Sequence, residues 1–422
     1  MVDWLKEVLY FPLASYFRFF ASIRLRRWNP RVIVVTGSNG KTTLLHMLEA
    51  QIGDKAKYSH HANTSFGIPF DILDLHKKNF SYLGWINLFL EAPFSAFKNS
   101  PKEKIYIVEA DAYRPGVGKF VGELLRPEVV LWVSTGRTHS MNFDRLVAQG
   151  KFKNVEEAIA YEHGYFLEYC SKLAVINGDS ELSLRQKDRT KAEVKIVTKE
   201  KDLKKFSLTK EGTIFELVET KLTLPYLLPE EIFYSINLCK NAIDYLDIKF
   251  DQSFSDLVMP PGRGTIFEGI KDTTLIDSTY NANLGSISVV LKMFADFPEK
   301  KKWVVISDML ELGQEEKEEH EKLAEILKKM NFEKIILFGK RTAKYTYEKL
   351  KKTDSVISFQ KHAELKTYLQ ENLNGGEAVL FKGSQSTYLE GIIESLLKNK
   401  SDAQRLPRRG EFWERMRRHA EL

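Results

Sequence analysis

The chain of 422 residues has little cysteine, no internal repeat and no low-complexity segment. Its two cysteines, Cys170 and Cys239, are too few and too far apart for a disulfide framework or a cysteine zinc site. Such sparse cysteine fits a reducing cytoplasm. Because 43% of the residues are hydrophobic, the chain can bury sizeable cores, and its length predicts two or three domains.

A strong charge of one sign is also missing. The 63 Lys and Arg residues are nearly balanced by 57 Asp and Glu residues, which leaves a net charge of +6. No basic stripe is interleaved with stacking aromatic residues, so a nucleic-acid partner is not expected. Anionic small molecules or lipid headgroups suit this mild positive charge better.

The N-terminal region lacks an apolar run long and pure enough for a transmembrane helix. Residues 8–23 are rich in aromatics, but Pro12 and Arg18 interrupt them, and no small-residue cleavage site marks a signal peptide. Four arginines follow at once: Arg24, Arg26, Arg27 and Arg31. Residues 80–97 form a second aromatic stretch. Two interpretations stay open: both stretches lie at a membrane interface, or both pack on the protein itself.

A candidate phosphate-binding loop is the clearest motif that is present. Residues 32–43, VIVVTGSNGKTT, run from a β-branched strand through Gly37 and Gly40 into a helix-like segment. A phosphate loop needs backbone N–H groups at a helix N-terminus, a lysine for the outer phosphates and a hydroxyl for magnesium. The common pattern would place a glycine at Val35, so this loop is a tighter variant. The alternative is an ordinary glycine turn, but Lys41 and Thr42 favour ATP or GTP binding.

The remaining sequence alternates strand and helix patterns, which predicts an α/β fold. Short apolar runs at 105–109, 129–134 and 173–177 end in polar residues, as parallel strands do at the carboxyl edge of a sheet. Charged, β-rich segments at 194–198, 205–209 and 213–218 predict a small antiparallel sheet. We expect three parts: an N-terminal segment (1–31), a central P-loop ATPase-like domain with a mostly parallel sheet (32–258), and a smaller Rossmann-like domain (259–422).

Four motifs together resemble the Mur ligases. They are VTGSNGKTT at 35–43, IDSTYNAN at 276–283, SDMLELG at 307–313 with His320 downstream, and FKGSQS at 381–386. The YNAN and DMLELG motifs resemble the branch of the family that adds D-alanyl-D-alanine to a muramoyl-tripeptide. In this family the Val35 spacing is normal. The resemblance implies an ADP-forming amide ligase, with ATP and Mg2+ as cofactors, that acts as a cytoplasmic monomer.

The resemblance also implies roles for residues near the phosphates. Magnesium must neutralise the crowded oxygens while an acyl phosphate forms and is attacked by an amine. Thr42, Glu109 and His139 match metal-binding positions, and Lys41, Glu109, His139 and Lys382 match catalytic positions. The expected ATP-binding residues are Thr36, Gly37, Ser38, Asn39, Gly40, Lys41, Thr42, Thr43, Asn177, Asn237, Arg263, Asp277, Tyr280 and Asn281.

The two other substrates are expected to meet different segments. Asn63 and Thr64 resemble a loop near the acyl acceptor, while Lys382 and Ser384 form a corner suited to a carboxylate. Asp308 and Glu311 could orient the incoming ammonium and take its proton. The full expected substrate-binding set is Asn63, Thr64, His163, Asn283, Asp308, Glu311, Lys382 and Ser384.

The chain departs from the family in two places. Many Mur ligases carry a lysine, often carbamylated, where this sequence has His163, and a histidine cannot become a carbamate. Family members also carry an amino-terminal domain that holds the UDP-sugar, whereas about thirty residues precede the loop here. We therefore expect an altered grip on the acceptor, and work on a lipid-linked or altered precursor at the inner membrane face.

Two alternatives to this ligase remain. A polyglutamate-type relative would use another acceptor, although the YNAN and DMLELG motifs argue against it. A membrane-associated ATP-binding module without ligase activity is the other, and Lys41, Thr42, Glu109 and Lys382 argue against that.

Overall fold

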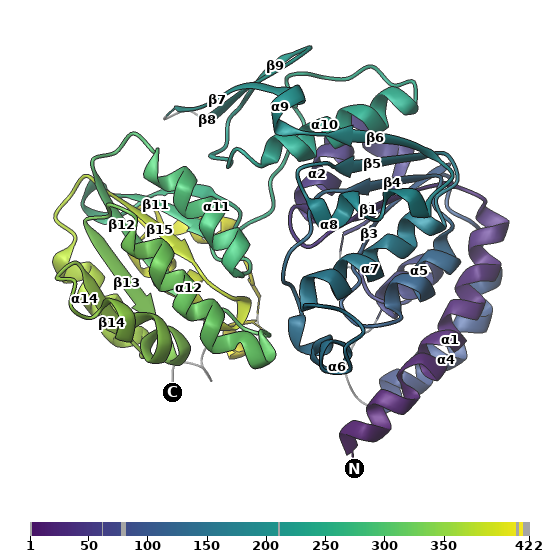
Figure 1. The fold of residues 1–422 in the computed structure, drawn as a ribbon, viewed down its shortest axis with the longest axis horizontal. Helices are drawn as coiled ribbons and strands as arrows, with labels where there is room; N and C mark the ends of the chain where they lie inside the picture. Colours follow the sequence, from purple (N-terminus) through teal and green to yellow (C-terminus); the bar gives the residue numbers. More distant parts are fainter. Residues whose placement is uncertain (1, 61, 77–81, 210–211, 411–412, 417–422) are drawn as a thin grey trace. The chain divides into compact units, whose positions relative to one another are not determined.

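The computed structural model describes residues 2–60, 62–76, 82–209, 212–410 and 413–416 (Figure 1). Two compact units are present, and neither is one continuous segment. The first unit comprises Met1–Gly136, Arg145–Asp202 and Tyr234–Leu257, and the second comprises Arg137–Asp144, Leu203–Phe233 and Val258–Leu422.

The first unit is built on a six-stranded parallel sheet with the order β2-β3-β1-β4-β5-β6. Its four inner strands, β3, β1, β4 and β5, are almost entirely buried and rich in Val and Ile, as expected for a parallel sheet that is covered by helices. The strands are β1 (Arg31–Thr36), β2 (Ala56–Ser59), β3 (Ile105–Ala110), β4 (Val129–Trp132), β5 (Leu173–Asn177) and β6 (Glu193–Val197).

The helices of this unit alternate with its strands. Helix α2 follows β1 directly, so the phosphate loop lies at the carboxyl edge of a central strand. Helices α5 and α7 pack against each other. The bounds are α2 (Lys41–Ile52), α3 (Gly67–Leu73), α5 (Val117–Leu125), α6 (Asp144–Ala148), α7 (Val155–Glu168), α8 (Glu181–Leu184), α9 (Lys199–Asp202) and α10 (Ile232–Tyr245).

Both aromatic stretches of the sequence form helices, α1 (Val2–Trp28) and α4 (Tyr82–Phe97), which lie side by side (Figure 1). Residues 80 and 81 of the second stretch are outside the described residues. Phe17 is fully buried and packs on Phe70 and Phe89, and the Tyr16 hydroxyl donates to the Phe89 carbonyl at 2.7 Å. Among the described helices, none is long and apolar enough to cross a membrane. Packing on the protein itself therefore accounts for the inner faces of both helices.

The second unit contains a six-stranded sheet with the order β10-β11-β15-β12-β13-β14, in which only the β10–β11 pair is antiparallel. Its strands are β10 (Thr265–Glu268), β11 (Thr274–Ser278), β12 (Lys301–Ser307), β13 (Lys334–Phe338), β14 (Val356–Phe359) and β15 (Glu377–Lys382). The helices are α11 (Leu284–Ala295), α12 (Glu316–Lys328), α13 (Glu348–Leu350), α14 (His362–Asn372) and α15 (Leu389–Leu396). A separate antiparallel sheet consists of β7 (Leu203–Thr209), β8 (Gly212–Leu217) and β9 (Lys221–Leu224).

The α/β class with a mostly parallel central sheet and a second α/β sheet is confirmed. One strand was assigned to the wrong sheet: residues 194–198 were expected in the small antiparallel sheet, but β6 pairs in parallel with β5. Its alternating charges misled the prediction, because β6 is an edge strand and exposes most of its residues. Segments 137–144 and 203–233, expected within the central domain, group with the second unit.

Candidate active site

The phosphate loop connects β1 to α2 through two glycines with positive φ. Gly37 has φ 129° and Gly40 has φ 85°, values that side-chain-bearing residues rarely adopt. A Cβ added at Gly37 would lie 2.6 Å from the Ser134 carbonyl oxygen. The Ser38 amide donates to that same oxygen at 3.0 Å. The segment after β4 therefore packs directly against the loop. The positive φ values of Gly37 and Gly40 explain why both positions are glycine.

Side chains within the loop fix its shape. The Ser38 hydroxyl donates to the Gly136 carbonyl at 2.7 Å, and the Asn39 amide donates to the Ser134 hydroxyl at 2.8 Å. Thr36 is fully buried and its hydroxyl donates to the Ala110 carbonyl. Thr43 is also buried. The amide groups at the start of α2 remain as the part of the loop suited to an anion.

Lys41 is buried at the first position of α2. Its ammonium lies 3.1 Å from Asp111 Oδ2 and donates to the Gly37 carbonyl at 2.5 Å. Both side chains of this ion pair are more than nine-tenths buried. A buried charge is stabilised when it is paired and hydrogen-bonded, so the Asp111 carboxylate stabilises the Lys41 ammonium beside the loop.

Thr42 and Glu109 meet across the loop, as the sequence predicted for a magnesium site. The Thr42 hydroxyl donates to Glu109 Oε2 at 2.9 Å, and the Glu109 amide donates to the Ser59 hydroxyl. A hydroxyl and a carboxylate oxygen are donors that Mg2+ prefers. The third expected ligand, His139, belongs to the second unit, where its Nδ1 lies 2.7 Å from Glu311 Oε2.

His163 lies fully buried on α7. Its Nδ1 is 2.8 Å from the Thr36 hydroxyl, and its ring packs near Trp132. Burial lowers the pKa of His163 to about 4, with Asp111 opposing and Lys41 adding to the effect. The imidazole is therefore neutral near pH 7. In place of the family lysine, this chain holds an uncharged ring behind the phosphate-loop strand.

Several other predicted residues of the first unit form hydrogen bonds with nearby backbone groups. The side-chain amide of Asn177 donates to the Val133 carbonyl at 2.9 Å. The backbone amide of Asp179 donates to Asn177 Oδ1. The Thr64 hydroxyl accepts from the Gly67 amide at the start of α3. The Asn63 carbonyl accepts from the Asp111 amide at 3.0 Å, and Asn237 is buried on α10. The contact through Asp111 links the expected acceptor segment to the partner of Lys41.

In the second unit, Lys382 is the last residue of β15 and Asp277 is the last but one of the neighbouring parallel strand β11. Lys382 is paired in register with Ser278, and its ammonium donates to the Asn281 carbonyl. Asp277 Oδ1 accepts from the Thr279 amide and hydroxyl. Burial, with a contribution from Arg263, lowers the pKa of Lys382 to about 7, and burial raises the pKa of Asp277 to about 6. Both groups therefore titrate close to neutrality.

The YNAN segment, residues 280–283, adjoins Lys382 and Asp277. The Arg263 guanidinium lies over the Tyr280 ring, 4.4 Å from its centre. Asn281 Oδ1 accepts from the Ala282 amide, and Asn283 caps α11 by accepting from the Ser286 amide at 2.8 Å. The Asn283 backbone amide in turn donates to the Ser286 hydroxyl, which completes a capping box. The motif thus builds the turn between β11 and α11.

The DMLELG segment is held by buried contacts. Asp308 accepts from the Thr342 amide at 2.8 Å and from the Thr342 hydroxyl. His320 Nε2 accepts from the Met309 amide, and the Ser384 hydroxyl accepts from the Leu310 amide. Burial lowers the pKa of His320. These contacts fix the segment, and Glu311 at its tip carries the carboxylate that faces His139.

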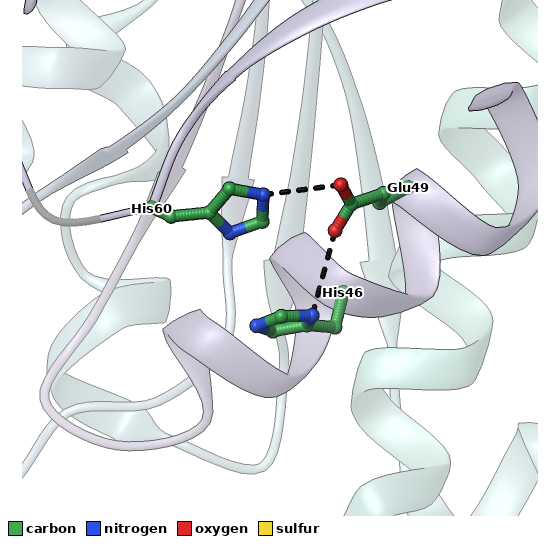
Figure 2. Close-up of side chains that lie close together, drawn as sticks. All are labelled: His46, Glu49 and His60. Carbon is green, nitrogen blue, oxygen red and sulfur yellow. Dashed lines mark hydrogen bonds and ion pairs between the residues drawn. The ribbon is translucent and has the colours of Figure 1, made fainter. Parts of the chain in front are cut away.

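Sequence reasoning missed some of the residues that complete the site. Asp111 directly follows β3, the strand that contains Glu109, so the argument from strand ends could have found it. A cluster beside the loop was also missed: His46 and Glu49 on α2 converge with His60, which directly follows β2 (Figure 2). The i, i+3 spacing of His46 and Glu49 was a signal, but nothing in the sequence placed His60 beside them.

Two family descriptions match the chain. The Mur ligase middle domain matches residues 35–232, and the Mur ligase glutamate ligase domain matches residues 262–385. Together they cover both sheets that carry the predicted site.

The sequence is similar to two proteins named UDP-N-acetylmuramoyl-tripeptide–D-alanyl-D-alanine ligase. The protein from Borreliella burgdorferi is 23% identical over 385 residues, covering 88% of this chain and 76% of the relative. The protein from Bacillus subtilis is 23% identical over 399 residues, covering 90% and 78%. The fold is similar to a MurF ligase from Thermotoga maritima solved in complex with ADP, with a TM-score of 0.73, 22% identity and coverage of 90% and 83%. The chain belongs to the Mur ligase family.

Proposed function

We propose that the chain is an ATP-dependent amide ligase of cell-wall precursor synthesis. It joins D-alanyl-D-alanine, or a similar dipeptide, to the terminal carboxylate of a muramoyl-tripeptide. The carboxylate attacks the γ-phosphate of ATP, the dipeptide amine attacks the resulting acyl phosphate, and ADP and phosphate leave. The phosphate loop with its paired Lys41 and Thr42 carries the proposal, because it occurs in a chain that matches both ligase domains.

The first unit would hold the phosphates. The start of α2 supplies backbone N–H groups, and Lys41 can turn its ammonium from the loop carbonyls towards the outer phosphates. Asp111, 3.1 Å from the Lys41 ammonium, would help to orient that ammonium during turnover. Asn177 and Asn237 are our candidates for the nucleotide's other contacts in this unit.

Thr42 and Glu109 would hold the magnesium ion. Their two oxygens already lie 2.9 Å apart, and an oxygen donor set fits Mg2+. When bound, the ion supplies charge neutralisation for the phosphate oxygens. His139, which belongs to the second unit, remains our candidate for a further ligand of this ion, as the family resemblance suggests.

The second unit would hold the base, the ribose and the dipeptide. We assign Asn281 to the adenine, Asp277 to the ribose and Arg263 to phosphate or ribose. Lys382, with Ser384, would bind the dipeptide carboxylate, since an approaching anion favours the charged form of a lysine whose pKa lies near 7. Asp308 Oδ1 accepts two hydrogen bonds from Thr342, so we assign the contact with the amine to Glu311.

Product formation tests this proposal directly. ADP release should require both UDP-N-acetylmuramoyl-tripeptide and D-alanyl-D-alanine, and mass spectrometry should detect the pentapeptide product. Release of phosphate with neither substrate present would instead identify a simple ATPase. Turnover with glutamate in place of the dipeptide would identify a polyglutamate-type ligase.

We also propose that this ligase works in the cytoplasm, as a monomer at the membrane face. On α4 the exposed side chains Ile86, Leu90, Phe94 and Phe97 follow a helical spacing and form one apolar stripe. Phe94 is 76% exposed. On the adjacent α1, Leu9, Leu13 and Phe19 are exposed as well. We call these seven side chains the α1–α4 apolar face.

Exposed cations adjoin one end of this face. The guanidinium of Arg27 donates to the Ala96 carbonyl, so the C-terminal ends of α1 and α4 lie together. Arg26, Lys98, Lys102 and Lys104 are exposed in the segments at or after these ends. Apolar side chains bordered by lysine and arginine suit a membrane interface rich in anionic lipids.

Vesicle flotation tests the membrane contact. The chain should float with vesicles containing phosphatidylglycerol and remain at the bottom with pure phosphatidylcholine. Phe94→Ser with Phe97→Ser should abolish flotation, whereas Val258→Ser, which changes an equally exposed side chain of the second unit, should not. A dimer in light scattering that the double variant dissociates would assign the α1–α4 apolar face to a second copy instead.

A further inference from the structure

Two imidazoles and one carboxylate converge beside the phosphate loop. His46 and Glu49 lie on α2, one and nearly two turns after Thr42, and His60 follows the last residue of β2. Their ligand atoms all lie within 4.8 Å of one another (Figure 2). This cluster is separate from the Thr42–Glu109 pair, and the ligase mechanism uses none of its three residues.

The carboxylate of Glu49 faces both rings at once. Its Oε1 lies 3.1 Å from His60 Nε2, and its Oε2 lies 3.5 Å from His46 Nδ1 (Figure 2). The second distance is long for a hydrogen bond. It is close to the separation of about 3.4 Å expected between two ligands of one tetrahedral ion with bonds of about 2.0–2.1 Å. The separations of Glu49 from both imidazoles are thus compatible with ligands of one shared ion.

The surroundings keep these groups in place while leaving them open to solvent. The backbone of β2 is paired with β3, and α2 follows the phosphate loop, so regular elements carry or adjoin all three residues. The Tyr58 ring stacks on His60 at 6.0 Å, and the Tyr58 hydroxyl donates to the Gly53 carbonyl. The side chains of His46, His60 and Glu49 are 21%, 29% and 38% exposed. An ion could enter and leave.

We infer that His46, Glu49 and His60 bind a divalent transition-metal ion of the zinc class. Two imidazole nitrogens and a carboxylate favour Zn2+, Co2+ or Ni2+ over Mg2+, which prefers oxygen donors. Three protein ligands leave at least one position for water, so the site is exchangeable rather than closed.

Such an ion would fasten the segment after β2 to helix α2. His60 lies three residues before Asn63, whose carbonyl accepts from the Asp111 amide. Occupancy of the metal site would therefore restrain the position of Asn63, which is hydrogen-bonded to Asp111, the partner of Lys41. The inference does not depend on the proposed ligase activity, since it rests on ligand geometry alone.

Zinc titration of the whole tag-free chain tests the site, with excess Mg2+ present throughout. Calorimetry should show one Zn2+ per chain, and His46→Ala, His60→Ala and Glu49→Gln should each weaken binding at least about tenfold. His76→Ala is the matched control, because its imidazole is highly exposed on the same unit, and it should bind as the wild type does. Circular dichroism would verify that each variant is folded.

Two further readouts are independent of activity. Cobalt bound in place of zinc should give the visible absorption of a tetrahedral site, and this absorption should vanish in His60→Ala. Zinc should raise the melting temperature of the wild type and of His76→Ala but not of the three ligand variants. Absence of zinc binding by the wild type, or equal binding by all three ligand variants, overturns the inference.

Discussion

Each unit buries a lysine at the carboxyl edge of its parallel sheet, but the two lysines have opposite surroundings. Lys41 pairs with the Asp111 carboxylate at 3.1 Å. Lys382 donates to a backbone carbonyl, and among the described residues it forms no ion pair. Burial lowers the pKa of Lys382, and of the nearby charges Arg263 lowers it further while Asp277 opposes the effect.

This difference separates two uses of a buried ammonium. A lysine with a carboxylate partner holds a fixed charge, which suits the constant negative charge of ATP phosphates. A lysine held near neutrality gains its charge when an anion arrives, so its protonation responds to the ligand. The first unit therefore provides a permanent cation, and the second provides one that depends on occupancy.

Removal of the permanent cation should have the largest effect. Lys41→Met should lower kcat by about 10²–10³-fold or more, since a charge aimed at the transferred phosphoryl group is lost. Lys104→Met, which removes an exposed lysine of the same unit, should leave kcat unchanged. Steady-state ADP release measures both variants, and full activity of Lys41→Met would remove the phosphate loop from the mechanism.

The lowered pKa of Lys382 should be detectable in the pH dependence of the free energy of unfolding. Burial lowers the pKa of Lys382 from 10.5 to about 7, so between these values the unfolded chain carries a proton that the folded chain lacks. Folded stability contributed by this group therefore rises with pH from about 7 to 10.5 and is lowest below 7. Lys382→Met should lack this rise.

Urea unfolding at several pH values from neutral to alkaline measures this effect as a difference from the wild type. Lys104→Met serves again as the control and should keep the wild-type slope. Parallel stability profiles for the wild type and Lys382→Met would show that Lys382 keeps its proton throughout and would contradict the lowered pKa.

His163 extends the comparison to the neutral ring behind Lys41. Its pKa of about 4 lies below the ordinary 6.5, so the unfolded chain binds the proton first as the pH falls. Stability is present above pH 6.5 and is lost as the pH falls towards 4. His163→Gln should remove about 3 kcal/mol of this acid sensitivity. Acid unfolding followed by circular dichroism measures it, and an unchanged acid slope contradicts a neutral buried ring.

The smallest effect is expected at the YNAN turn of the second unit. Asn283→Ala should cost about 1 kcal/mol of stability by removing the cap of α11, while Asn283→Ser should restore most of it. KM for ATP and for the dipeptide should stay unchanged if the side chain only caps the helix. A raised KM in Asn283→Ala, with stability restored in Asn283→Ser but KM still high, would instead assign Asn283 to substrate binding.

Local patterns explain most of what the sequence could predict. The phosphate loop was recognisable because strand, glycines, Lys41 and Thr42 are contiguous, and the meeting of Thr42 with Glu109 followed from the rule that parallel strands end at one edge. The helical patterns at residues 285–294 and 315–330 predict α11 and α12 to within two residues of their bounds.

Contacts between distant segments explain what the sequence could not predict. The burial of His163 depends on how α7 packs behind β1, and the partner of Lys41 depends on the pairing of β1 with β3. His46 and His60 are separated by a strand and a turn, so no spacing rule joins them. The prediction for the edge strand β6 was wrong for a related reason. An exposed edge strand lacks the continuous apolar sequence that is typical of a parallel strand.

The discontinuous units have a practical consequence for anyone who divides this protein. Between residues 1 and 422 the backbone passes from one unit to the other five times, at 136/137, 144/145, 202/203, 233/234 and 257/258. A truncation at residue 258 would deprive the second unit of β7, β8 and β9 and of the segment in which Arg137 pairs with Glu315. Neither fragment contains one complete unit without parts of the other. The two fragments are therefore best co-expressed, so that they can reassemble.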